Sequence, residues 1–128
     1  MKLTIRHFFD AAHQLPDTEH LITKGCANLH GHTYAVKIEF DGDSKDLKGG
    51  MVVDFKGIKN IVDILDHRFI NDVFMERNFP YIASSEYISR FIYEEILMKY
   101  PYLQNLVVSI CEGYKGEERG SWTTYDGK

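Results

Sequence analysis

The chain has 128 residues, of which 44% are hydrophobic and 27% charged, and its formal net charge is −4. These values predict one domain, residues 1–128, with a packed core. They argue against nonspecific nucleic-acid binding, which needs dense positive charge. No run of about eighteen apolar residues occurs, so no transmembrane helix is expected. The N-terminal stretch MKLTIRHFFDAAHQL carries His7 and Asp10 and lacks a signal-peptide h-region, so we expect a cytoplasmic protein.

Two alternating segments predict strands over residues 2–13 and 30–41. Apolar residues of the first segment share one parity, as they do when one face of a strand is buried: Leu3, Ile5, Phe9 and Ala11. Residues 14–29 contain Pro16, Gly25 and several polar side chains and predict a long loop. The Gly- and Asp-rich residues 42–50 predict a turn.

The second half of the chain predicts two helices and two further strands. Apolar residues recur at helical intervals over residues 55–65, after the capping residue Asp54, and over residues 85–99, after Ser84 or Ser85. Residues 106–112 form a strongly apolar strand pattern and residues 120–126 a weaker one. The expected fold class is α+β, an antiparallel sheet with two helices on one face.

The stretch CANLHGH, residues 26–32, favours a metal site. His30 and His32 are two apart on a predicted strand, so their side chains share a face. His13, at the end of the first strand, reaches the same point if the two strands are neighbours. Three imidazoles with one open position are typical of catalytic zinc. Imidazole also accepts iron and nickel.

Other interpretations of these residues stay open. The HxH pattern also arises by chance, and Cys26 is a possible fourth ligand of a purely structural zinc site. Cys111 lies in an apolar run and is most simply a small core residue. We expect both cysteines to be reduced, as is usual in a cytosolic chain.

Asp66 and His67, within LDHRFIN, form a second unusual pair. A carboxylate beside an imidazole can act as a proton relay, although the residues alone favour an exposed helix end, where the pair has no role. Glu112 follows an apolar strand. It is either a solvated carboxylate at a strand end or an acid that faces an amidine-like group, such as the guanidine edge of a pterin.

Taken together, several motifs resemble the family of 6-pyruvoyltetrahydropterin and 6-carboxytetrahydropterin synthases. They occur in family order over nearly the whole chain: FDAAHQLP, CANLHGHTYAV, GGMVVDF, LDHRFIN, SSEYIS, ICEG and SWTTY. The CxxxHGH spacing resembles the 6-carboxy branch, which acts in queuosine biosynthesis. One departure is the longer, charged stretch GYKGEERG between Glu112 and Ser121.

The resemblance implies a role for each matching residue. It implies zinc ligands at His13, His30 and His32. It implies a catalytic thiol at Cys26, a proton-transfer pair at Asp66 and His67, and a pterin anchor at Glu112. Ser84 and Ser85 match a segment that lines the pterin pocket. No motif assigns the triphosphate contacts, for which Lys24, Arg68, Lys115 and Arg119 are candidates.

The resemblance also implies the reaction and the assembly. The reaction is conversion of 7,8-dihydroneopterin triphosphate to 6-carboxy-5,6,7,8-tetrahydropterin, with release of acetaldehyde and triphosphate. The alternatives are the 6-pyruvoyl product, without carbon–carbon cleavage, and a non-catalytic zinc-stabilised binding module. The implied fold is the tunnelling fold, whose sheets close into a barrel in trimers that stack as hexamers. No nucleic-acid or membrane partner is implied.

Overall fold

The computed structural model describes residues 1–21, 24–116 and 120–128. Four strands form one antiparallel sheet in the order β1-β2-β3-β4: β1 (Lys2–His13), β2 (His30–Asp41), β3 (Gln104–Glu112) and β4 (Trp122–Tyr125). The α-helices are α1 (Phe55–Val62), α2 (Ile70–Glu76) and α3 (Ser85–Lys99). Two short 3-10 helices are η1 (Lys24–Ala27) and η2 (Ser44–Asp46).

The structure confirms the predicted sheet and the main helices. Strands 2–13 and 30–41 and helix 85–99 have the predicted bounds. Helix α1 ends at Val62 rather than at residue 65, and the last two strands differ from their predicted bounds by one or two residues at their ends. The caps are confirmed too, because the side chain of Asp54 accepts from Lys56 N–H and that of Ser84 from Tyr87 N–H.

The prediction of only two α-helices was incomplete, because α2 is a third. This helix has seven residues, and its N-cap, Phe69, makes no side-chain capping hydrogen bond. A helix this short shows less than two turns of apolar periodicity, and without a polar cap its start carries no signal in the sequence.

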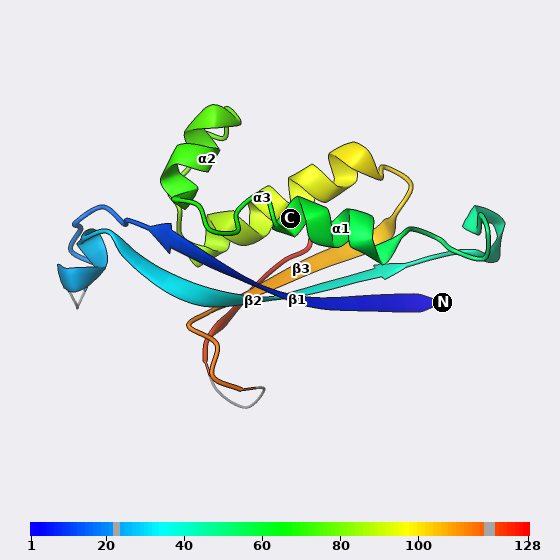
Figure 1. The fold of residues 1–128 in the computed structure, drawn as a ribbon, viewed down its shortest axis with the longest axis horizontal. Helices are drawn as coiled ribbons and strands as arrows, with labels where there is room; N and C mark the ends of the chain where they lie inside the picture. Colours follow the sequence, from blue (N-terminus) through cyan, green and yellow to red (C-terminus); the bar gives the residue numbers. More distant parts are fainter. Residues whose placement is uncertain (22–23, 117–119) are drawn as a thin grey trace.

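All three helices lie on the same side of the sheet (Figure 1). The alternation of β1 sets this arrangement, since Ile5, Phe9, Ala11 and His13 are buried on that side while Thr4 and Arg6 are exposed. Phe9 stacks on Tyr34 of β2, with ring centroids 4.9 Å apart. Helix α3 fills the core with Ile88, Phe91, Ile92 and Ile96. The core therefore lies between the sheet and the helices.

Within the described ranges, none of the helices combines the length and the apolar character of a membrane span. Both cysteines are free: Cys111 is buried and Cys26 is partly exposed. Burial raises the pKa of the Cys111 thiol. Cys111 is thus buried, as the sequence indicated, but on the face of β3 opposite the core residues Val108 and Ile110.

Candidate metal centre and active site

Strand register brings the three predicted metal ligands together. His13 pairs directly with His30 across β1 and β2, and Ala11 pairs with His32. Because residues i and i+2 of a strand share a face, all three imidazoles project from the core side of the sheet. Ring centroids lie 4.5 Å apart for His13 and His30, and 4.8 Å apart for His30 and His32.

Main-chain carbonyls orient two of these imidazoles. Nδ1 of His13 lies 2.7 Å from the Ala83 carbonyl, and Nδ1 of His30 lies 2.7 Å from the Asn28 carbonyl. An Nδ1–H that donates to a carbonyl leaves a lone pair on Nε2. The two Nε2 atoms are 2.9 Å apart. Two lone pairs at this distance repel unless a proton or a cation lies between them, so the pair is arranged to bind one.

Glu112 joins the three histidines, and these four residues are called the metal group below. The Oε1 atom of Glu112 lies 3.0 Å from His32 Nε2 and its Oε2 lies 3.9 Å from His13 Nε2. His32 Nε2 is buried without a hydrogen-bond partner among the described residues, so the contact with Glu112 is close but poorly directed. One nitrogen or oxygen from each of His13, His30, His32 and Glu112 falls within 4.8 Å of the others. Cys26 is not in this group, so the alternative in which its thiol is the fourth ligand stays a prediction.

Burial keeps the imidazoles in the state that binds metal. His13 is fully buried, and desolvation lowers its pKa despite the hydrogen bond to Ala83, which acts in the opposite direction. Desolvation also lowers the pKa of His32, again more strongly than the Glu112 charge raises it. Both imidazoles therefore stay neutral below the pH at which an ordinary histidine is protonated, and neutral imidazole is the metal-binding form.

The donor set fits a divalent transition metal such as zinc. Imidazole nitrogens and one carboxylate are ligands that zinc accepts in tetrahedral sites, whereas calcium and magnesium prefer oxygen alone. Nearby, the Tyr34 hydroxyl is fully buried and has no hydrogen-bond partner among the described residues. Burial holds the pKa of Tyr34 far above its ordinary value, so this hydroxyl is neutral and can donate a hydrogen bond.

Asp66 and His67 form a second, exposed group with Asp10. The Asp66 carboxylate lies 2.9 Å from His67 Nδ1 and accepts the Asp10 N–H at 3.0 Å. His67 has a φ of 58° and donates its N–H to the Asp10 carbonyl at 2.6 Å. A non-glycine residue in this left-handed region is strained, and such strain often accompanies function. The hydrogen bond from the Asp10 main chain is the main reason why the pKa of Asp66 is lowered.

A cavity lies beside the exposed group, at the paired strands β1 and β2. It has a volume of about 590 Å³ and is lined by His32 of the metal group, by Asp10 and His67 of the exposed group, and by Thr33 and Arg68. This volume is in the range of small-molecule sites. A ligand in the cavity would meet the carboxylate–imidazole pair, on the face of the sheet opposite the three histidine rings.

Comparison with known proteins agrees with this geometry. Residues 2–128 match the sequence profile of a family described as 6-pyruvoyl tetrahydropterin synthase. The chain belongs to this family. It is 33% identical over 118 residues to the 6-carboxy-5,6,7,8-tetrahydropterin synthase of Haemophilus influenzae, a match that covers 74% of this chain and 81% of that protein.

Two further relatives support the family and the fold. A putative 6-carboxy-5,6,7,8-tetrahydropterin synthase of Archaeoglobus fulgidus is 33% identical over 103 residues, covering 77% of this chain and 78% of the relative. The solved structure of Caenorhabditis elegans 6-pyruvoyl tetrahydropterin synthase superimposes with a TM-score of 0.70. It is 24% identical and covers all of this chain and 96% of its own, so it shows that the tunnelling fold is shared.

Of the remaining candidate residues, Ser85 contacts the metal group. The Ser85 hydroxyl donates to Glu112 Oε2 at 3.1 Å, whereas Ser84 caps helix α3. Cys26 lies partly exposed in η1, outside the group of close ligand atoms. Arg68 lines the cavity and also pairs with Glu76, with Nη2 2.8 Å from Oε1. Lys115 is exposed, and Arg119 and the side chain of Lys24 lie outside the described residues.

Sequence reasoning missed Asp10, which anchors the exposed group of this family member. Its main chain holds both Asp66 and His67, and its carboxylate accepts from the Thr33 hydroxyl across the β1–β2 pair. The strand alternation offered a signal, since Asp10 and Thr33 both lie on the face opposite the histidines. Nothing in the sequence shows that the distant residues 66 and 67 reach this point.

Proposed function

We propose that this protein converts 7,8-dihydroneopterin triphosphate to 6-carboxy-5,6,7,8-tetrahydropterin, with release of acetaldehyde and triphosphate, as a step in queuosine biosynthesis. The observation that carries the proposal is the group of His13, His30, His32 and Glu112, whose possible ligand atoms lie within 4.8 Å of one another. The CxxxHGH spacing and the identity to the Haemophilus influenzae protein favour the 6-carboxy product.

The proposed cofactor is zinc, held by His13, His30 and His32. When bound, it supplies Lewis-acid chemistry that polarises the oxygens of the substrate side chain. The orientation of His13 and His30 by main-chain carbonyls supports this assignment, because it leaves Nε2 of both rings as ligand atoms.

Proton transfer is assigned to Cys26, Asp66 and His67. As a thiolate, Cys26 would remove a proton from the substrate side chain. The Asp66–His67 pair would move a second proton, with the ionised Asp66 stabilising the charged imidazole. The proposed cleavage consumes one water molecule, since the side chain leaves as acetaldehyde and the ring carbon gains a carboxylate.

Substrate binding is assigned to Glu112, with support from the pocket-lining segment of Ser84 and Ser85. The Glu112 carboxylate would accept charge-assisted hydrogen bonds from the amidine edge of the pterin. The Ser85 hydroxyl holds one carboxylate oxygen, which leaves the other free to turn from His32 toward the substrate. Among the candidate cations, Arg68 is assigned to binding the triphosphate, because it lines the cavity.

The proposal extends to assembly and location. The helix-free face of the sheet carries the exposed Phe8 beside Tyr114 and Trp122, with Phe8 and Tyr114 ring centroids 5.3 Å apart. Exposed aromatic side chains on a sheet face are typical of an interface. We propose that this face is covered in a homo-oligomer, a trimer or a hexamer of the tunnelling fold, in the cytoplasm.

Mass-spectrometric product analysis tests the proposed reaction. Zinc-loaded protein is incubated with 7,8-dihydroneopterin triphosphate, and we expect 6-carboxytetrahydropterin together with acetaldehyde. A 6-pyruvoyl product would overturn the assignment to the 6-carboxy branch. No consumption of substrate by metal-loaded protein would overturn the catalytic function itself.

The variant Cys26→Ala tests the role of the thiol. We expect it to keep zinc and to lose turnover by roughly 10²- to 10⁴-fold, the range for loss of a general base. The matched control is Cys111→Ala, which removes the buried thiol on the other face of β3 from Glu112. Loss of zinc from Cys26→Ala would instead support the non-catalytic zinc-stabilised module.

A further inference from the structure

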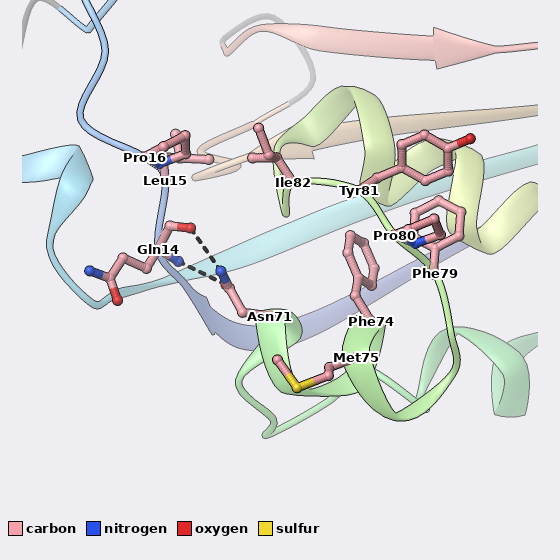
Figure 2. Close-up of a pocket in the computed structure, with 10 residues that line it drawn as sticks. All are labelled: Gln14, Leu15, Pro16, Asn71, Phe74, Met75, Phe79, Pro80, Tyr81 and Ile82. Carbon is pink, nitrogen blue, oxygen red and sulfur yellow. Dashed lines mark hydrogen bonds between the residues drawn. The ribbon is translucent and has the colours of Figure 1, made fainter.

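The side chain of Asn71, the last residue of LDHRFIN, forms two hydrogen bonds with the main chain of Gln14. Asn71 lies in the first turn of α2, and its Oδ1 accepts the Gln14 N–H at 3.0 Å while its Nδ2 donates to the Gln14 carbonyl at 3.0 Å. Figure 2 shows both bonds at the edge of an apolar cavity of about 590 Å³, lined by Phe74, Phe79 and Ile82 among others. The amide thus pairs with residue 14 as a neighbouring strand would.

Gln14 in turn contacts η1, the short helix that carries Cys26. Its side-chain Nε2 donates to the Ala27 carbonyl at 2.8 Å, and the next residue, Leu15, donates its N–H to the Cys26 carbonyl at 3.3 Å. A four-residue 3-10 helix such as η1 has little stability of its own. The position of Cys26 therefore depends on these bonds to residues 14 and 15.

The same stretch of backbone also carries a metal ligand. Gln14 directly follows His13, which is fully buried and bound to the Ala83 carbonyl. The two hydrogen bonds from Asn71 consequently fix the main chain at Gln14, between His13 and the contacts with η1. A change in this segment alters the separation of the thiol and the metal group without removing any ligand.

We propose that Asn71 is a positioning residue for Cys26, acting through Gln14. The inference rests on the proposed function, in which the Cys26 thiol takes a proton from a substrate bound at the metal group. Only an amide offers a donor and an acceptor in one plane, as a main-chain N–H and C=O require. Aspartate lacks the donor and leucine lacks both.

The test measures the alkylation rate of Cys26 by iodoacetamide, with mass spectrometry and with Cys111 as an internal reference. In Asn71→Ala we expect alkylation of Cys26 to be about five- to tenfold faster, because the turn loses its restraint. With substrate, kcat should fall by a similar factor while KM and zinc content stay unchanged. The matched control is Asn60→Ala, which removes an exposed amide on α1.

A second variant approaches the same connection from its other end. Gln14→Ala removes the hydrogen bond to Ala27 but keeps α2 and both hydrogen bonds between Asn71 and the main chain of residue 14. It should reproduce the faster alkylation, and the double variant should add little to either single change, because both act on one connection. Gln14→Ala also keeps the test valid if Asn71→Ala fails to fold.

Two outcomes would overturn the inference. If Asn71→Ala lowers the melting temperature but leaves Cys26 alkylation at the wild-type rate, Asn71 only anchors α2. If alkylation accelerates equally at Cys26 and Cys111, the effect is global unfolding. Failure of the proposed function looks different, since the metal-loaded wild-type protein would then consume no 7,8-dihydroneopterin triphosphate while the alkylation rate still responded to Asn71→Ala.

Discussion

Two groups of acidic and imidazole side chains lie close together on β1 and β2 but on opposite faces. On the core face, His13 is fully buried and His30, His32 and Glu112 are partly buried. On the other face, Asp10 and His67 are exposed, and Asp66 is partly exposed. Burial keeps the His13 and His32 imidazoles neutral, which is the form that binds a metal. Exposure and a main-chain hydrogen bond keep Asp66 charged and suit the second group to proton transfer.

The difference shows that ligand type alone does not define a metal site. Both groups bring an imidazole and a carboxylate within 4.8 Å of each other. Only the core-face group has imidazoles whose Nδ1 atoms are held by main-chain carbonyls, which aims Nε2 at a common point. In the exposed group the imidazole is instead bound to a carboxylate, as in a proton relay.

The largest expected effect is loss of metal from His32→Ala. Removing a ligand should weaken zinc binding beyond the roughly 10- to 100-fold cost of losing a second-shell partner, and turnover should fall to background. His67→Ala should retain zinc. Metal content after dialysis measures both variants. Zinc loss from His67→Ala, with retention in His32→Ala, would reverse the assignment of the two groups.

Asp66→Asn should have the next largest effect. The amide oxygen can still accept the Asp10 N–H, so the turn should stay folded, but the negative charge beside His67 is lost. We expect kcat to fall by roughly 10²- to 10⁴-fold with unchanged zinc content. Steady-state kinetics measures this change. The control is Asp63→Asn, which affects the pair with His7 elsewhere on β1, and equal losses in the two variants would contradict a specific role for Asp66.

Glu112→Gln tests whether the Glu112 carboxylate binds the pterin or the metal. Loss of its charge-assisted hydrogen bonds should weaken pterin binding by roughly 10- to 100-fold, while the three histidines keep zinc. Fluorescence titration with a pterin, together with metal analysis, tests this expectation. If Glu112→Gln loses zinc at the same rate as His32→Ala, the carboxylate is a metal ligand rather than the pterin anchor.

Much of this site could be predicted because its residues lie on long strands. The alternation of residues 2–13 and 30–41 places His13, His30 and His32 on one face, and antiparallel pairing of successive strands brings them together. Glu112 was harder to place, since its approach to His32 depends on the β2–β3 register, in which it pairs with Tyr34. Its role as pterin anchor came from the family resemblance.

The parts that could not be predicted depend on contacts between distant segments. Helix α2 is too short for a periodic signal, and its residue Asn71 reaches Gln14 across 57 positions of sequence. The pairing of Asp66 and His67 with Asp10 spans a similar separation and requires a left-handed φ at His67, a conformation that histidine rarely adopts. Local patterns carry no information on either contact.

The smallest expected effect is the pH dependence of folding in the metal-free protein. Burial lowers the pKa of His13 and His32 below the ordinary value of 6.5, so the unfolded chain binds protons at a higher pH than the folded chain does. Stability is therefore full above about pH 6.5 and decreases as the pH falls through the interval below it. Thermal unfolding of chelated protein between pH 7.5 and 5.5 should show a falling melting temperature. His32→Asn should show a shallower slope, because one buried imidazole is gone, and an unchanged slope would mean that the core-face group does not control this dependence.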